Sequence, residues 1–334
     1  MKPILMANSD QTGAACGHGS GKGDLTGSYC TFQEPWWLNL VTEGNWDEVV
    51  IRNEKLLGRL PYCVKRKLGV NVVTQPPFTP FLGPWISCHG PDTKGFADQY
   101  AILGELIAEL PQFDIFRHNF WPELQNWLPF YWTGFSQTTC YTYWLRDTAD
   151  PNAVWSGFSQ SARRAVRRAE HEVAVVATTD VDRLCSMYER TFAQQGKPPP
   201  YGKRVLSRIA EGALRAGRGR ISYACDTQGN MHAVNFVVFD DRTAHYLVGG
   251  SDDRFRKSGA ASLLMWDAIK FAAERHLVFD FEGSMVAGIE RFFRTFNPSL
   301  IPYNRVSKVR GMAGTLIHFR NAVTSLMGRP PLRI

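Results

Sequence analysis

LVGGSDDRFRKSGAASLLMWDAIKFAAERH, residues 247–276, contains a strand, a turn and a helix in succession. The turn consists of Arg256, Lys257, Ser258, Gly259, Ala260 and Ala261. Small residues at such a turn let backbone N–H groups approach an anion, and the helix N-terminus adds partial positive charge. The turn is predicted to bind the phosphates of a ligand, and a bulky residue at position 259 is predicted to block that ligand without unfolding the protein. A helix start that only packs closely would have the same composition.

A regular succession of helices and strands surrounds this turn. In the second half, helices are predicted at 159–170, 180–195, 202–215, 259–275 and 286–295, and strands at 172–177, 219–225, 231–240, 243–250, 277–282 and 301–308. In the first half, a helical segment is predicted after Pro35, strands at 47–52, 56–65, 68–74, 112–118 and 138–146, and a helix at 97–110. Each half runs helix, antiparallel strands, helix, strand, which predicts two similar mixed α/β units.

The domain limits follow from this pattern and from composition. We expect a flexible N-terminal tail at 1–28, a first domain at 29–150, a second domain at 151–310, and a C-terminal helix and tail at 311–334. The formal net charge is +7, and residues 151–220, with thirteen basic and six acidic side chains, account for all of it. An anionic partner is expected to meet that segment. Seven scattered cysteines, no apolar signal segment and no long apolar run predict a cytoplasmic protein without integral membrane association.

Three passages resemble a known family. The spacing Arg-x-x-Gly-x-Ala at 256–261 is similar to the pyrophosphate loop of the GCN5-related N-acetyltransferases (GNAT). FDFEGSMVAGIERFFRTFNPSLIPYNRVSK (279–308) resembles the C-terminal signature of the Fem-type aminoacyltransferases and their BioF2-like relatives. WSGFSQSARRAVRRAE (155–170) and, more weakly, LPYCVKRKLGVNVVTQPPFTPFLGPW (60–85) are similar to other passages of that group.

The resemblance implies an α/β fold of mixed sheets, with tandem GNAT-like domains and an interdomain groove. It implies an enzyme that transfers an acyl group from acyl-CoA to a small-molecule, sugar or peptide amine. Two alternatives stay open: a Fem-like aminoacyltransferase that uses aminoacyl-tRNA, and a non-catalytic module that binds an anion or RNA. The acyl group, the amine, the pathway and the oligomeric state are left undefined.

An amine attacks an acyl donor only when it is neutral, so the site needs a proton acceptor and a donor for the leaving group. Glu282, at the end of the strand FDFE, is the candidate base, and it stands where the family more often has Gly. Tyr303 is the candidate proton donor. Arg291 and Arg294 share a helix face and could clamp a phosphate or carboxylate. For each of these residues an ordinary surface or packing role is the competing interpretation, and for Asp280 a structural hydrogen bond is favoured.

Substrate and anion contacts are assigned to two further sets. Tyr246, Ser284, Trp85 and Tyr201 are candidates for binding substrate, although packing explains the aromatic residues equally well. A stripe of like charges on the helix at 159–170 is costly unless an anion such as RNA or CoA phosphates binds there, or unless the face is simply solvated. The stripe consists of Arg163, Arg164, Arg167 and Arg168. The eight histidines show no paired ligand spacing, so no metal site is predicted.

Overall fold

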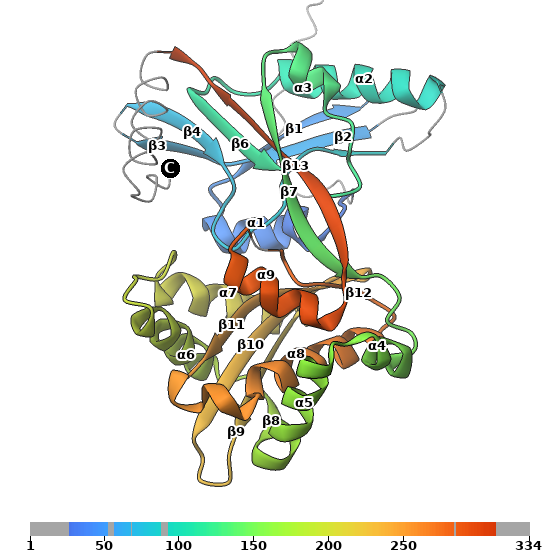
Figure 1. Ribbon diagram of the computed structural model, residues 1–334. Helices are drawn as coiled ribbons and strands as arrows, with labels where there is room; N and C mark the ends of the chain where they lie inside the picture. Colours follow the sequence, from blue (N-terminus) through green and yellow to red (C-terminus); the bar gives the residue numbers. More distant parts are fainter. Residues whose placement is uncertain (1–26, 53–56, 68, 88–92, 284, 312–334) are drawn as a thin grey trace, which may run out of the picture.

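The computed structural model describes residues 27–52, 57–67, 69–87, 93–283 and 285–311. The described strands form one three-stranded sheet, in the order β1-β2-β5, and one ten-stranded sheet, in the order β3-β4-β6-β13-β7-β12-β11-β10-β9-β8. The large sheet runs through both halves of the molecule (Figure 1). The predicted mixed α/β class is therefore confirmed.

The first half contains η1 (Thr31–Gln33), α1 (Pro35–Thr42), β1 (Asp47–Arg52), β2 (Leu57–Tyr62), β3 (Val64–Lys67), β4 (Val70–Thr74), β5 (Trp85–Ile86), α2 (Thr93–Ala108), β6 (Ile115–Asn119), α3 (Leu128–Trp132) and β7 (Ser136–Leu145). Helix α2 packs on the small sheet through contacts with β1, β2 and β5. The Pro-rich stretch 75–84 has no regular structure, because proline cannot donate to a strand ladder. Helix α3 is short and was not predicted.

The second half contains α4 (Pro151–Gly157), α5 (Gln160–Glu172), β8 (Ala174–Thr178), α6 (Val181–Gln194), α7 (Lys203–Arg215), β9 (Gly219–Cys225), β10 (Met231–Phe239), β11 (Thr243–Ser251), η2 (Asp253–Ser258), α8 (Ala260–Ala273), β12 (Val278–Asp280), α9 (Ala287–Phe293), η3 (Arg294–Phe296) and β13 (Ser299–Val309). Apart from the short α4 and the 3-10 turns, each element lies within a few residues of a predicted one. Helices α6 and α7 pack on one face of β9–β11, and α8 packs on the other with α5 against it.

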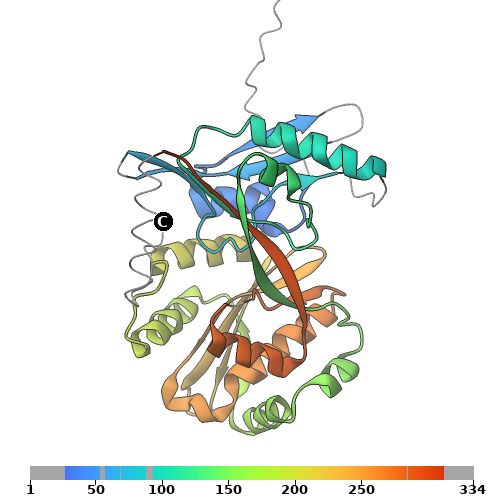
Figure 2. The same ribbon diagram turned by 45° about the horizontal axis from the view of Figure 1, so that its top comes forward.

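Strand β13 returns the chain to the first half. It pairs antiparallel with β6 on one side and with β7 on the other, although it was expected to complete the second unit. Strand β7 in turn pairs with β12, so that β7 and β13 form a long twisted ribbon between the two halves (Figures 1 and 2). The predicted boundary at residue 150 falls between β7 and α4 and remains a prediction.

Two large hydrophobic clusters hold the sheet, and a third, small one consists of Val70, Val72 and Ile115. The larger one joins the halves, because Phe32 and Trp37 of the first half share it with Leu184 and Leu206 of α6 and α7. The second lies on the opposite face, beneath α5, α8 and α9. All five cysteines in the described part of the chain have free thiols. Among the helices that the structure describes, none has both the length and the apolar character that a membrane span requires.

Candidate active site

The sheet opens where β11 and β12 diverge. These parallel strands pair only over three residues of each, from Thr243↔Val278 to His245↔Asp280, while β11 continues to Ser251. On its other side β11 carries a bulge, because the register with β10 shifts between Phe236 and Val237. Bulges bend a strand and are common beside active sites. The pairing of β11 with β12 therefore ends in the middle of the sheet.

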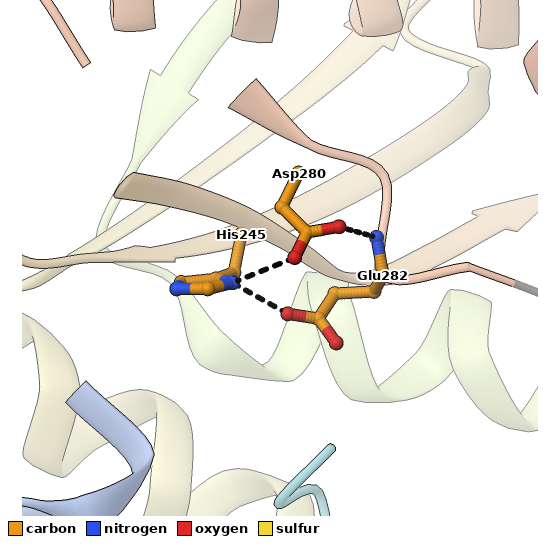
Figure 3. A group of neighbouring side chains, drawn as sticks. All are labelled: His245, Asp280 and Glu282. Carbon is orange, nitrogen blue, oxygen red and sulfur yellow. Dashed lines mark hydrogen bonds and ion pairs between the residues drawn. The ribbon is translucent and has the colours of Figure 1, made fainter. Parts of the chain in front are cut away.

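Three ionisable side chains meet at this point: His245, Asp280 and Glu282 (Figure 3). The Nδ1 atom of His245 lies 2.6 Å from Oε1 of Glu282 and 3.6 Å from Oδ2 of Asp280. The side chains of His245 and Asp280 are fully buried, and that of Glu282 is 9% exposed. The cluster thus excludes water, because both carboxylate oxygens of Glu282 are buried as well.

A tight turn directs Glu282 to the histidine. Oδ1 of Asp280 accepts hydrogen bonds from the Thr142 hydroxyl at 2.5 Å and from the Glu282 N–H at 2.8 Å. Glu282 then adopts φ 61°, in the left-handed region that non-glycine residues avoid. Gly283 follows with φ 45°, and a Cβ there would lie 2.3 Å from the Tyr141 carbonyl oxygen. The Asp280 carboxylate and Gly283 therefore hold Glu282 in a strained position.

Aromatic rings from the first half cover the cluster. The ring centroid of His245 lies 4.6 Å from that of Phe32 and 6.2 Å from that of Trp121. Phe81 contacts both Trp121, at 5.4 Å, and Tyr303, at 5.1 Å. The cluster is consequently assembled by both halves of the chain.

Tyr303 lies on the same sheet face as the cluster. It pairs with Cys140 of β7, two residues before the Thr142 that binds Asp280, and residues two apart on a strand share a face. Burial raises the pKa of Tyr303, and the neighbouring Cys140 and Glu282 act in the same direction, against a smaller opposing effect of Arg305. The phenol therefore stays protonated at neutral pH, as a proton donor must.

Burial and the interactions of the imidazole with the two carboxylates set the pKa values of the cluster. Burial lowers the pKa of His245, but hydrogen bonds and charge from Asp280 and Glu282 outweigh it and raise that pKa to about 10. Burial, with the charge of Asp280 adding to it, raises the pKa of Glu282 to about 8, against the opposing effect of His245. At neutral pH, His245 is cationic and Glu282 is mostly protonated, and the ionised form of Glu282 that can accept a proton increases as the pH rises towards 8. A carboxyl group with such a pKa suits proton transfer.

The same three residues are the one group in the described part of the chain whose ligand atoms could hold a metal ion. One atom from each of the three lies within 4.8 Å of the others. Imidazole and carboxylate are ligands that divalent transition metals accept. The 2.6 Å contact uses His245 Nδ1 and Glu282 Oε1 directly with each other, so an ion would have to replace that pair.

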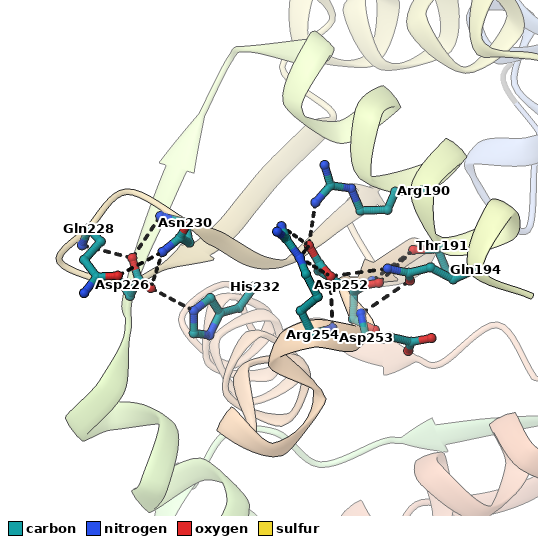
Figure 4. Close-up of polar contacts among 11 residues, drawn as sticks. Arg190, Thr191, Gln194, Asp226, Gln228, Asn230, His232, Asp252, Asp253 and Arg254 are labelled. Atoms are coloured by element: carbon teal, nitrogen blue, oxygen red, sulfur yellow. Dashed lines mark hydrogen bonds and ion pairs between the residues drawn. The ribbon is translucent and has the colours of Figure 1, made fainter.

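The turn predicted to bind phosphates begins with η2, which is held by Asp252 (Figure 4). The buried Asp252 carboxylate accepts hydrogen bonds from Arg190 at 2.5 Å and from Arg254 at 2.7 Å, as well as from the Arg254 N–H at 3.0 Å. On the other side, the ring of His232 stacks on Phe255 at 4.0 Å. These contacts fix the segment before α8.

Part of this turn lines a surface hollow together with one arginine of the predicted stripe. The hollow has a volume of about 590 Å³ and is lined by Arg256, Lys257 and Ser258 of the turn and by Arg168 of α5, among others. Arg168 also donates a hydrogen bond to the Lys257 carbonyl at 2.7 Å. The structure thus brings two of the predicted anion-binding groups together.

Gly259 has a packing role that corrects one prediction. It adopts φ 81°, and a Cβ at this position would lie 2.3 Å from the Ala165 carbonyl oxygen in α5. A β-branched residue would therefore force α5 and α8 apart rather than only block a ligand. The adjoining Ala260 is buried in the second cluster, and Ala261 packs against that cluster.

The other stripe residues point in different directions. Arg163 donates hydrogen bonds to the carbonyls of Ser156 and Phe158, both at 2.7 Å, so it secures the end of α4. The guanidinium of Arg167 lies 5.9 Å from the Trp155 ring centroid. Arg164 and Arg167 are exposed.

Several predicted residues do not join the cluster. Arg291 and Arg294 are exposed on α9 and η3, which pack on the opposite face of the sheet, and Arg294 Nε lies 3.8 Å from Glu290. Tyr246, which follows His245, also lies on this opposite face, where the centroid of its ring is 6.1 Å from that of Phe293. Trp85 lies at the small sheet, where its ring centroid is 6.3 Å from that of Tyr29. Ser284 lies outside the described residues.

Tyr201 lies at a cavity between the two halves. Its ring is 4.8 Å from that of Phe78, and its carbonyl accepts a hydrogen bond from the Tyr188 hydroxyl at 3.2 Å. The cavity has a volume of about 720 Å³ and lies over β4, β6 and β13. An interdomain groove was predicted, and of the predicted substrate residues that the structure describes, Tyr201 alone lines this cavity.

The histidine of the cluster was missed, although its strand pattern contained a signal. In FDF, Phe279 and Phe281 are buried in the second cluster, so Asp280 between them faces the other way. Ala244 belongs to the second cluster and Tyr246 packs against it, so His245 must face the same side as Asp280. Only the parallel pairing of the two strands shows that they lie opposite each other.

Comparison with known proteins agrees with this architecture. Residues 156–294 match the family described as an acetyltransferase (GNAT) domain. The chain is similar to FemX, with 11% identity and a TM-score of 0.62, over 82% of this chain and 91% of that one. It is also similar to L-PGS from Bacillus licheniformis, with 12% identity and a TM-score of 0.52, over 91% of this chain and 93% of that one. No curated protein sequence matches the chain.

The chain therefore has a GNAT/Fem-like fold of mixed α/β type. The residues that match the acetyltransferase (GNAT) domain lie in the second half, and the divergence of β11 and β12 lies within them.

Proposed function

We propose that this protein is an N-acyltransferase that moves an acyl group from acyl-CoA to an amine, with Glu282 as the general base. The observation that carries the proposal is the buried contact of Glu282 with His245 at the divergence of β11 and β12, within a GNAT-type domain. A strained, nearly buried carboxylate with a pKa of about 8 is expensive to maintain in a purely structural role.

The two sheet faces give the two substrates separate approaches. Glu282, His245 and Tyr303 face the first half of the molecule, whereas Tyr246 and α9 lie on the opposite face. The amine approaches Glu282, which accepts its proton as the new amide bond forms. His245 acts as a positioning residue, because its contact at 2.6 Å fixes the carboxylate and sets its protonation. Tyr303, kept protonated by burial, supplies the proton for the leaving thiolate.

The donor is assigned to the other face. Its phosphates would lie at Arg256, Lys257 and Ser258, where Arg168 adds a further positive charge. Arg291 and Arg294, exposed on the same side of the sheet as α8, are available to the donor rather than to the base. The exposed Arg164 and Arg167 favour aminoacyl-tRNA as the second candidate donor, since RNA binding needs several accessible cations.

The proposal is tested by calorimetric titration of the full chain with acetyl-CoA, free CoA and charged tRNA, followed by an assay of thiol release with a panel of amines. We expect saturable CoA binding that raises the melting temperature by mass action. Glu282→Gln should bind acetyl-CoA with unchanged affinity and should release CoA at least about a hundredfold more slowly.

Arg256→Gln provides the matched control, because it should weaken donor binding and leave the pH dependence of turnover unchanged. Binding of charged tRNA without binding of CoA would replace the donor in this proposal. Binding of neither ligand would favour the non-catalytic module.

A further inference from the structure

The cavity between the halves has a positively charged floor. Residues from four neighbouring strands form this floor: Lys65 from β3, Val72 and Thr74 from β4, Arg117 and Asn119 from β6, and Arg305 from β13. Pro200 and Tyr201 of the second half complete the wall. Among the described residues that line the cavity, none is acidic.

The strand register brings the two arginines together. Arg305 pairs with Asn119, and Arg117 lies two residues before Asn119 on the same strand. Such diagonal neighbours share a sheet face with side chains about 7–8 Å apart at their bases, within reach of a common ligand. Partial loss of solvation, and then the like charge of Arg305, lower the pKa of Arg117, which stays exposed at the cavity. Two cations held this close indicate a place for an anion.

Arg305 is held in position by uncharged side chains. Its Nε donates to Asn119 Oδ1 at 2.9 Å, and Asn119 Nδ2 donates to the Pro80 carbonyl at 2.9 Å. Gln75 accepts from the Asn119 N–H at 3.2 Å and donates to the same Pro80 carbonyl at 2.6 Å. Because the Arg305 Nε donates to Asn119, this hydrogen-bond network fixes the orientation of the guanidinium and of its two terminal nitrogens. A fixed guanidinium matches the geometry of a phosphate group.

We propose that this cavity binds a phosphate group, and that the phosphate belongs to the amine acceptor. The three cationic side chains favour a doubly charged phosphate over a single carboxylate. A volume of about 720 Å³ exceeds what one phosphate needs, and leaves room for the organic part of a small molecule. The assignment to the acceptor rests on the proposed function.

Tyr303 lies on β13 between the strand position of Arg305 and the cluster. Tyr303 and Arg305 are two residues apart on β13, so they share a face with a separation of about 7 Å along the strand. The protonation of Tyr303 is influenced by Arg305 on one side and by Glu282 on the other. A phosphate on Arg305 therefore leaves the rest of the acceptor close to Tyr303 and Glu282.

Phosphate binding is tested on the full chain by calorimetry with inorganic phosphate and with pyrophosphate at constant ionic strength. We expect saturable binding that Arg117→Gln or Arg305→Lys weakens at least tenfold. Arg66→Gln is the matched control, because Arg66 is exposed, follows Lys65 on β3 and so faces away from the cavity. The affinity of this variant for phosphate should stay within twofold of the wild-type value. The melting temperature of the ligand-free Arg117→Gln protein shows that the variant is folded.

Two results would overturn the phosphate site: no saturable binding of either anion, or equal binding by a folded Arg117→Gln/Arg305→Lys double variant. The acceptor assignment has its own test, in which phosphate should compete with the amine and not with acyl-CoA. Competition with acyl-CoA alone would overturn that assignment. The two proposals can also fail separately. If Arg117→Gln loses phosphate binding but the wild-type protein transfers no acyl group, the phosphate site is supported and the proposed function is refuted.

Discussion

At the scale of single residues, Glu282 combines an unfavourable backbone conformation with an unfavourable environment for a carboxylate. Its backbone adopts φ 61°, and its side chain is nearly buried beside a second carboxylate. Glycine would adopt this conformation without strain, which explains why the resembled family more often has glycine there. A glutamate retained under these conditions supports a role that only its carboxylate can fill.

Matched substitutions at this position separate strain from chemistry. Glu282→Ala and Glu282→Gly both remove the carboxylate, so both should lose at least about a hundredfold in turnover. They differ in backbone freedom, so the glycine variant should be more stable than the alanine variant by about 1 kcal/mol. Chemical denaturation and steady-state kinetics measure the two effects. Equal stability would refute the strain, and wild-type turnover in either variant would refute the base.

The cluster also predicts how stability depends on pH. His245 has a pKa of about 10 in the folded protein against an ordinary 6.5, and Glu282 has about 8 against 4.5. Both groups bind protons more tightly when folded, so their contribution is complete at low pH and is lost as the pH rises through these folded values. The unfolding free energy should therefore fall between about pH 4.5 and pH 10, first through Glu282 and then through His245. Denaturation of a His245→Gln/Glu282→Gln variant over this range should show a flatter profile, and an identical slope would contradict the assignment.

At the scale of elements, local patterns predicted almost every helix and strand of the second half. Periodicity and turn residues act within one element, and they are visible in the sequence. Partner choice is not visible in this way: His245 and Asp280 become neighbours only through the pairing of β11 with β12. For the same reason the sequence predicted Glu282 but not the histidine it contacts, nor the pair Arg117 and Arg305.

The junction of α5 and α8 illustrates a close approach that only the structure shows. Gly259→Ala should destabilise the protein by about 3 kcal/mol, because the new Cβ meets the Ala165 carbonyl and because φ is positive. Gly104→Ala is the matched control in helix α2, where nothing lies within 4 Å, and should raise stability by up to about 1 kcal/mol. Thermal unfolding of the two variants gives the comparison. An unchanged Gly259→Ala protein would show that the two helices can separate at little cost.

At the scale of the whole molecule, the two halves are not independent. The chain enters the second half after β7 and returns through β13, whose strand lies between β6 and β7. The alternating pattern of 301–308 predicted a strand but could not indicate its sheet, because the same alternation fits any half-buried position. The cover of the cluster by Phe32 and Trp121 has the same origin, since it depends on contacts between distant segments.

A shared core and a shared ribbon predict one cooperative unfolding transition. Val306 is fully buried in β13 and belongs to the cluster that joins the halves, so Val306→Ala should lower the unfolding free energy by about 2 kcal/mol. Hydrogen exchange should show an equal loss of protection in β6 and in β10, although β10 does not contact the mutated strand. Val309→Ala, at a 37% exposed position of the same strand, should change stability by less than about 0.5 kcal/mol. If the loss of protection were confined to β6, β7 and β13, the halves would be separate folding units, and the acceptor and donor sides of the active site could open independently of each other.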